Sequence, residues 1–412
     1  ILVNSRDHSI RDKTCNKIAI TIDKVTGRIT IHNTGHGLPI EIHKDHGIYV
    51  PELILGNLLT SSNYEEKGKI VGGTNGLGAK LTNIYSVEFV IDTCCAVNNK
   101  TYHQRFYDNM TKKDAPIIES VDKKTKPYTT ISFIPDYAKF GMKDGITDDV
   151  IALFEKRAYD VAGCTDDRVK VYLNGKKINI VNFREYIDMF YDGETIDLDK
   201  DLIYESTKRW DVGVVYDPSA GYCHNTYVNG ICTYNGGTHL NNVVDNIVHK
   251  LMKVIKQKHP KLQLKPAFIK EHMSVYINCS IEDPGFNSQV KEELTNKVAD
   301  FGSKYEPTDE FIKKLSKSGI IDDIVKLAEL KELASLQRIS GKKRSNLKGI
   351  TKYEPAQDAG TRQSKHCRLF LTEGDSAKTF VISGLEVIGH KRYGVFPLKG
   401  KLLNVREAPA KK

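Results

Sequence analysis

A glycine-rich stretch at residues 72–80, which reads GGTNGLGAK, holds the residues best suited to binding a charged ligand. Glycine allows left-handed backbone and lets a ligand come close to main-chain N–H groups. A helix predicted over residues 80–85 follows at once, and a helix start adds unpaired N–H donors and a positive dipole end. The stretch is therefore compatible with a loop that cradles phosphate groups, but for a glycine cluster on its own a tight surface turn is the more common structure.

The loop matches neither of the two common nucleotide-binding motifs. A P-loop ends in Gly-Lys-Ser or Gly-Lys-Thr, whereas this chain reads Ala79 and Lys80 after its last glycine. The dinucleotide motif GxGxxG ends in a glycine, and Leu81 occupies that position here. Other parts of the chain must therefore decide which ligand the loop holds.

Polar residues that could line the same ligand site occur in three further places. Asn4, Asp7 and His8 share one face of a helix predicted over residues 1–12, where the alternative is a solvated face. A second glycine loop, NTGHGLP at residues 33–39, follows a predicted β-hairpin. Residues 60–63, TSSN, form either a plain loop or a hydroxyl-rich wall of a ligand site.

Two carboxylates near the end of the chain suit a metal ion. A buried strand predicted over residues 368–371 leads into Glu373, Gly374 and Asp375, and a helix start follows. Carboxylate oxygens at a strand end are suitable ligands for Mg²⁺. The same residues would equally suit the N-cap of a helix.

The elements that position these residues form two successive α+β patterns. In the first, mostly antiparallel strands are predicted over residues 18–22, 29–31, 87–92, 102–107, 129–134, 169–173 and 177–180. Its further helices are predicted over residues 51–59 and 148–162, and Thr147 caps the second of these.

The second pattern starts near Trp210. Its strands are predicted over residues 212–216, 226–233 and 274–281, and an irregular loop covers residues 283–291. A long amphipathic helix is marked by Leu240, Val244, Ile247, Leu251 and Ile255, and further helices are predicted over residues 307–339. Residues 341–352 form a basic linker, which is solvated chain or touches a phosphate backbone.

Composition restricts the class of protein further. A length of 412 residues predicts two or three domains, and 40% hydrophobic with 27% charged residues is ordinary for a soluble protein. The net charge of +9 permits a polyanionic partner. The eight cysteines include no CxxC pair, so we expect inert thiols in a reducing compartment. No apolar run approaches the roughly 20 residues of a membrane span, and the ends of the chain lead us to expect an interior fragment.

The order of the motifs resembles one family. ILVNSRDH, NTGHGLPIEIH, LTSSNY and GGTNGLGAKLTNIYS together resemble the ATPase of eukaryotic-type DNA topoisomerase II, a GHKL protein like gyrase, Hsp90, MutL and histidine kinases. YNGGTH is similar to that family's GGTH segment, and QVK is similar to its QTK loop. EGDSA matches the opening of a TOPRIM domain, and PLKGKLLNVREA is also close to the family. The resemblance covers essentially the whole chain.

The resemblance implies ATP and Mg²⁺ as cofactors and assigns residues to them. Asn4 would ligate the Mg²⁺ of bound ATP, and Asn33 would face the adenine. Gln289 and Lys291 would enter from the second domain and touch the γ-phosphate, and Glu373 would be the first acidic Mg²⁺ ligand of the DNA-cleavage site. The ribose and phosphates would contact Ser61, Ser62, Asn63, Thr74, Asn75, Gly76, Leu77, Gly78, Ala79 and Lys80.

The chain departs from the family pattern in informative ways. Thr74 replaces an arginine and Leu77 a tyrosine, which predicts altered nucleotide affinity, and Val290 replaces the threonine of QTK. These differences suggest a divergent member, with a large-DNA-virus enzyme as the leading hypothesis. The family's general-base glutamate would directly precede Ile1, and the acidic DxD ligands and the DNA-attacking tyrosine would follow Lys412. We therefore expect this chain to bind Mg-ATP without hydrolysing it well and without cutting DNA.

The expected architecture is α+β, with a GHKL (Bergerat) ATPase sandwich, a transducer α/β domain and the first part of a TOPRIM domain. The expected boundaries are residues 1–205 for the ATPase, 206–340 for the transducer, 341–364 for the basic linker and 365–412 for the start of TOPRIM.

Three functions are compatible with the motifs to different degrees. The first hypothesis is the ATP-operated clamp of a type II topoisomerase, which would act as a homodimer on double-stranded DNA, away from membranes, in the nucleus or at a viral cytoplasmic replication site. The second is a GHKL chaperone or mismatch-repair clamp, and EGDSA argues strongly against it. The third is a non-enzymatic basic DNA-binding module whose glycine loops are only turns.

Overall fold

The computed structural model describes residues 1–57, 67–73, 76–191, 197–217, 221–260, 262, 264–340 and 352–398, without the side chains of 331–340. The chain divides into two compact units, Ile1–Ala328 and Glu329–Lys412. Among the described residues, no helix combines the length and the apolar character needed to cross a membrane. The predicted α+β fold class is confirmed, since helices and sheets alternate in both units.

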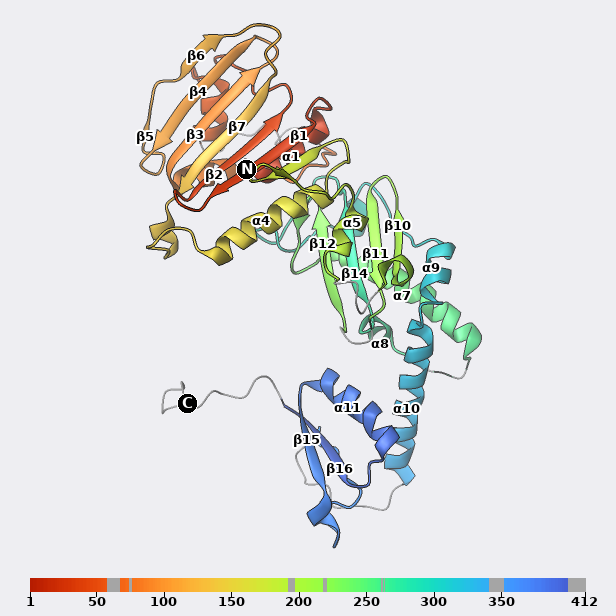
Figure 1. Ribbon diagram of the computed structural model, residues 1–412. Helices are drawn as coiled ribbons and strands as arrows, with labels where there is room; N and C mark the ends of the chain where they lie inside the picture. The colour runs from red at the N-terminus through yellow and green to blue at the C-terminus, as the bar shows by residue number, and fades with distance from the viewer. Residues whose placement is uncertain are drawn as a thin grey trace. The chain divides into compact units, whose positions relative to one another are not determined.

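The first unit begins with a nine-stranded sheet, seen at the red and orange end of the chain in Figure 1. Its described strands are ordered β5-β4-β3-β7-β2-β1-β8-β9, and β6 pairs with β4. All of these pairs are antiparallel except β1 with β8. The strand bounds are β1 Lys17–Asp23, β2 Arg28–Thr34, β3 Ser86–Cys95, β4 Lys100–Tyr107, β5 Lys112–Lys113, β6 Ile117–Ser120, β7 Tyr128–Pro135, β8 Lys170–Leu173 and β9 Lys176–Lys177.

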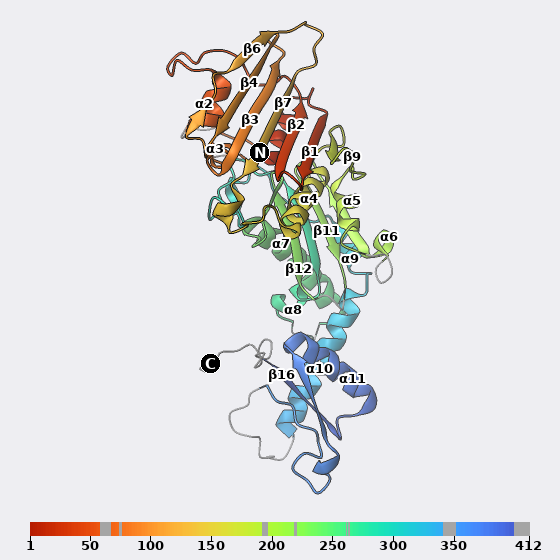
Figure 2. The same ribbon diagram turned by 60° about the vertical axis from the view of Figure 1, so that its left-hand side comes forward.

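One face of this sheet is apolar and carries the helices. Cross-strand pairing places Ile20, Ile31, Ile131 and Ile91 in one row across β1, β2, β7 and β3. Side chains alternate along a strand, so the intervening residues form a polar opposite face. The helices that pack on the apolar face are α1 Leu2–Arg11, α2 Val50–Gly56, α3 Gly78–Ile84 and α4 Asp148–Gly163 (Figure 2). This layer of helices brings the predicted ligand residues to one side of the sheet.

The second sheet of this unit has helices on both faces (Figure 1). Its described strands run in the order β10-β11-β14-β12-β13. Their bounds are β10 Leu202–Ser206, β11 Trp210–Val215, β12 Cys223–Val228, β13 Ile231–Cys232 and β14 Ser274–Cys279. One face packs on α7 Thr238–Lys258, α9 Asp309–Leu315 and the start of α10 Ile320–Ser340, and the other packs on α5 Phe183–Asp188. Two short helices, α6 Leu198–Asp201 and α8 Pro266–Lys270, complete the domain built on this sheet, which we call the second domain.

Two details of the second sheet differ from the sequence expectations. The single strand predicted over residues 226–233 is wrong, because Asn229 and Gly230 form a tight turn between β12 and β13. Both residues have left-handed backbone, with φ of 51° and 75°, which is the geometry of an Asn-Gly hairpin turn. In addition, the expected boundary at residue 205 falls inside β10, which belongs to the second sheet.

The second unit contains a parallel pair of strands and one helix. β15 Arg368–Glu373 pairs with β16 Tyr393–Leu398, and α11 Asp375–Ile388 connects them. A strand was expected here, but its predicted burial is wrong, because Leu369, Phe370 and Leu371 are all exposed. Among the described residues, β16 is the only strand beside β15, so both faces of the strand stay largely uncovered.

Candidate functional site

The glycine pair Gly72 and Gly73 lies between the first helix and a loop of the second domain. The carboxylate of Asp7 accepts hydrogen bonds from both main-chain N–H groups, at 3.0 and 2.8 Å. From the other side, Lys291 Nζ donates to the carbonyl oxygen of Gly72 at 2.7 Å. A β-carbon on Gly73 would lie 3.0 Å from Asn4 Oδ1, so the exposed Asn4 amide also faces this loop. Asn4 and Lys291, both predicted to contact the nucleotide, therefore meet at the same two glycines.

Burial shifts the pKa values of the two ionisable side chains that bond to the glycine pair. Asp7 is fully buried, and burial raises the pKa of its carboxyl, against the lowering effect of the Gly72 N–H and of Arg6. Burial likewise lowers the pKa of Lys291, while the nearby Asp7 raises it. The charge of Asp7 therefore favours the charged form of Lys291. Hydrogen bonds to the main chain direct both side chains at the glycine pair.

The C-terminal half of the glycine loop begins a helix, as the sequence predicts. Gly76 has left-handed backbone with φ of 60°, and α3 then starts at Gly78, with Leu77 at its N-cap. Lys80 is only 1% exposed, and burial lowers the pKa of its ammonium group. A buried ammonium so close to the loop supplies positive charge where an anion would bind.

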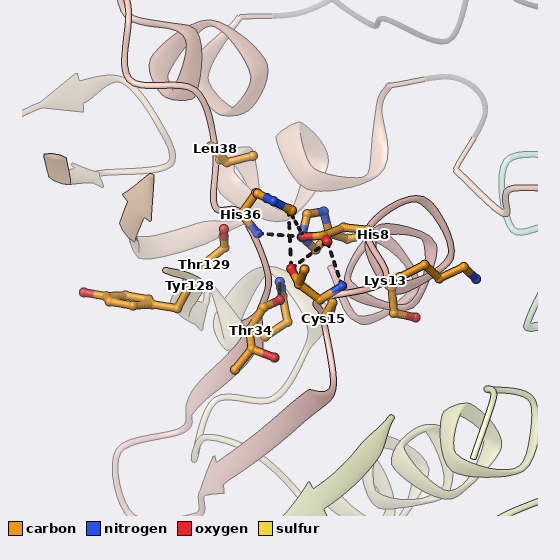
Figure 3. A network of polar contacts seen from close by, with 12 residues as sticks. His8, Lys13, Cys15, Thr34, His36, Leu38, Tyr128 and Thr129 are labelled. Atoms are coloured by element: carbon orange, nitrogen blue, oxygen red, sulfur yellow. Dashed lines mark hydrogen bonds and ion pairs between the residues drawn. The ribbon is translucent and has the colours of Figure 1, made fainter. Parts of the chain in front are cut away.

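Asp12, at the end of α1, is bonded to the second glycine loop. Figure 3 shows this polar network, with His36 of the loop and His8 of α1 labelled. The Asp12 carboxylate accepts from the N–H of His36 at 2.6 Å, contacts His36 Nδ1 at 2.8 Å and accepts from the Thr14 hydroxyl at 2.6 Å. Burial alone would raise the pKa of Asp12, but the hydrogen bonds from Thr14 and His36 outweigh it and hold the pKa far below its usual range. His8 adds a contact at 3.3 Å.

Asn33, the predicted adenine-facing residue, is the first residue of this segment and lies in β2, one residue before the strand ends. It is 5% exposed, it is on the helix-covered face of β2, and its Nδ2 donates to the carbonyl oxygen of Thr34 at 3.0 Å. Asn33 and the Gly72 pair are therefore both at the helix-covered side of the first sheet.

The remaining predicted residues are exposed, lie in the other compact unit or fall outside the described residues. Gln289 is exposed on the loop that carries Lys291. Glu373 is exposed at the end of β15, in the other compact unit, and the neighbouring Asp375 bonds to Lys352. Five predicted residues lie outside the described residues, namely Ser61, Ser62, Asn63, Thr74 and Asn75. In the described part of the chain, no three His, Cys, Asp or Glu side chains gather as a metal site.

Sequence reasoning missed three residues that contact the segment leading into the glycine loop. Asp7 was recognised only as part of a polar helix face, and its spacing from Asn4 was the available signal. Asn229 and Asp283, from the second domain, contact residues 68–71. Asn229-Gly230 is a hairpin signal that could have been found, whereas nothing local to Asp283 indicates its partner.

The fold and the site together define a class: an α/β sandwich with a glycine loop, completed by a lysine from a second α/β domain. Two solved structures are similar to this chain in fold. The ATPase region of Saccharomyces cerevisiae topoisomerase II matches with a TM-score of 0.74 and 38% identity, over 80% of this chain and 84% of that chain. The ATPase and transducer domains of DNA topoisomerase II from Balamuthia mandrillaris match with a TM-score of 0.76 and 36% identity, over 81% and 84%.

The chain belongs to the DNA topoisomerase II family. Residues 179–343 match the family model described as DNA gyrase B. DNA topoisomerase 2 of Acanthamoeba polyphaga mimivirus is 48% identical over 100% of this chain and 32% of its own length, and that of Drosophila melanogaster is 43% identical over 99% and 28%. The chain thus spans about a third of the length of these relatives. The predicted membership of the topoisomerase II family is confirmed, and the chaperone or mismatch-repair alternative is not supported.

Proposed function

We propose that this chain is the ATP-operated clamp of a type II DNA topoisomerase. The observation that carries the proposal is the contact of Lys291 with Gly72, because it joins the second domain to the predicted triphosphate loop. The similarity of this chain to the ATPase region of Saccharomyces cerevisiae topoisomerase II supports nucleotide binding at this site.

The nucleotide would lie along the helix-covered side of the first sheet. Asn33 would hold the adenine, and the loop from Gly76 to Lys80 would hold the phosphates through main-chain N–H groups and the buried ammonium. Asn4 fits a role in holding Mg²⁺, because its exposed amide oxygen, a hard donor, faces Gly73. When bound, Mg²⁺ supplies positive charge that offsets the charge of the phosphates.

Lys291 gives the clamp its dependence on nucleotide state. Its ammonium bonds the carbonyl oxygen of Gly72, which is a neutral acceptor, whereas a triphosphate would offer a charged and stronger one. A ligand shifts a conformational equilibrium only through such differential contacts. ATP would therefore favour one orientation of the second domain, and loss of the γ-phosphate would release it.

The remaining functions concern the longer protein. We propose that ATP binding joins two copies around a DNA duplex, and that a tyrosine outside this chain cuts DNA with Mg²⁺ at a site that includes Glu373. The division into an ATPase, a transducer that begins with β10, a linker at residues 341–364 and TOPRIM from residue 365 is part of the same proposal.

Nucleotide-dependent dimerisation tests the clamp. The mass of the chain is measured by sedimentation velocity with Mg²⁺ and either a non-hydrolysable ATP analogue or ADP. We expect dimers with the analogue and monomers with ADP. A chain that stays monomeric with the analogue would refute the clamp and would favour a simple DNA-binding module.

A further inference from the structure

Residues 67–73, which lead into the glycine loop, are held by the second domain at more points than Lys291. Asp283 accepts hydrogen bonds from the N–H groups of Gly68 and Lys69, at 2.7 and 3.1 Å. Its own N–H donates to the carbonyl oxygen of Lys69 at 2.9 Å. Two residues further on, Asn229 Nδ2 donates to the carbonyl oxygen of Val71 at 3.0 Å. The second domain therefore grips this segment from Gly68 to Gly72.

Asn229 is fixed in place by its other bonds. Its side chain is fully buried, its Oδ1 accepts from the N–H of Ile281 at 2.9 Å, and its Nδ2 also donates to the carbonyl oxygen of Ile281 at 2.9 Å. A buried amide with its groups paired in this way has one orientation. Because Ile281 is two residues before Asp283, Asn229 and Asp283 share one rigid support at the end of β14.

The three residues that hold this segment share an unusual backbone conformation. Asn229, Asp283 and Lys291 have φ of 51°, 44° and 64°, and they are the only non-glycine residues with left-handed backbone in the described chain after residue 200. A residue with a β-carbon adopts this conformation at a cost in free energy, so the surroundings must require it. All three side chains end on residues 67–73.

We propose that Asn229 and Asp283 are positioning residues that hold the triphosphate-binding loop in place whether or not a nucleotide is bound. The inference rests on the proposed function and deepens it. Lys291 is the residue predicted to contact the γ-phosphate, whereas Asn229 and Asp283 bond main-chain groups of residues 68–71. The orientation of the second domain therefore sets the position of Gly72 and Gly73 through a connection that nucleotide binding does not break.

Three variants of the full chain separate this role from general stability. Asp283→Ala removes an exposed carboxylate, Asp283→Asn keeps one acceptor oxygen, and Asn229→Gly keeps the left-handed backbone while removing the side chain. Asp300→Ala, an exposed carboxylate further along the same region, is the matched control. Hydrogen exchange of residues 67–73 is measured without nucleotide. We expect exchange about tenfold faster in Asp283→Ala and Asn229→Gly, intermediate in Asp283→Asn and unchanged in the control, with the urea midpoint of Asp283→Ala unchanged.

Nucleotide affinity completes the test. Asp283→Ala should weaken ADP and the ATP analogue by the same factor, roughly threefold to tenfold, because both nucleotides use the loop. Lys291→Ala should weaken only the analogue. Unchanged exchange in both alanine and glycine variants, or faster exchange with unchanged affinities, would overturn the inference. If the unmodified chain binds neither nucleotide, the proposed function itself is refuted. No result obtained with the variants alone would have that meaning.

Discussion

Lys291 Nζ and the carbonyl oxygen of Gly72 are joined by a 2.7 Å hydrogen bond, although 219 residues separate them in the chain. On the opposite side, Asp7 accepts from the N–H groups of Gly72 and Gly73. The glycine pair is thus held by a cation from the second domain and an anion from the first helix. The position of the loop therefore depends on the positions of both the first helix and the second domain.

Removing the cation should separate triphosphate from diphosphate binding. Lys291→Ala deletes the charge-assisted contact to a γ-phosphate, which contributes about 1.5–3 kcal/mol. We expect the ATP-analogue affinity, measured by calorimetry, to fall by about tenfold or more while ADP affinity is unchanged. Lys297→Ala, an exposed lysine of the same region, is the control. An equal loss of ADP affinity would show that Lys291 has another role.

Replacing the anion should loosen the loop directly. Asp7→Asn preserves shape but offers one acceptor oxygen where two N–H groups need partners. A buried unpaired donor costs about 1–3 kcal/mol. We expect a lower urea midpoint and weaker binding of both nucleotides, with Asp144→Asn, at an exposed position, showing neither effect. Full retention of stability would mean that the carboxylate is already protonated and shares its proton.

Most of the fold could be predicted from periodicity and turn signals, because these are local. Thr147 caps α4 through a bond from Val150 N–H, as expected. Asn174-Gly175, a local hairpin signal, closes the hairpin of β8 and β9. The strand predicted through Asn229 failed because the apolar pattern on both sides concealed the turn. The contacts of Asp283 could not be predicted, since they depend on how two domains meet and not on neighbouring residues.

The candidate site was predictable only where a motif carries the chemistry in a short stretch. Asn4, Asn33 and Lys80 could be named because each lies within a recognisable segment. The burial of β15 was predicted wrongly for a related reason. An apolar strand pattern indicates that a partner exists, but it does not say whether that partner lies within the described residues.

The buried His239 should make stability depend on pH. It is fully buried beside the Thr233 hydroxyl, its Nδ1 has no partner among the described residues, and burial lowers its pKa to about 3. Because this pKa lies below the unfolded value of about 6.5, the unfolded state binds the proton more readily. The free energy of unfolding is therefore highest above pH 6.5 and falls as the pH is lowered, by about 2 kcal/mol between pH 8 and pH 5.

Urea midpoints at the two pH values check this effect. His239→Gln should be less stable at pH 8 but should lose about 2 kcal/mol less than the unmodified chain on going to pH 5. His249→Gln, at an exposed position of the same helix α7, should keep the original pH dependence. Identical pH dependence in His239→Gln would assign the acid sensitivity to other groups.

Gly37, in the second glycine loop, should tolerate no side chain. Its φ is 73°, and a β-carbon would lie 2.0 Å from the carbonyl oxygen of Cys94. Gly175 has a similar φ of 79° with nothing within 4 Å, so Gly175→Ala meets the same backbone strain without the clash. We expect Gly37→Ala to be less stable than Gly175→Ala by about 1–3 kcal/mol in thermal unfolding. Equal melting temperatures would contradict the close approach to Cys94.

The distance in sequence between Gly72 and Lys291 also orders events during synthesis. A ribosome adds about 5–20 residues per second, so roughly 10–40 s pass between translation of the loop and translation of the lysine, 219 residues later. Asp7 is made before the loop, whereas Asn229, Asp283 and Lys291 all follow it. The first sheet of the nascent chain must therefore stay folded through this interval while its phosphate loop is held on the Asp7 side only. Nascent chains stalled before residue 229 should be much less resistant to protease at residues 67–73 than chains in which residues 229–291 have left the ribosome.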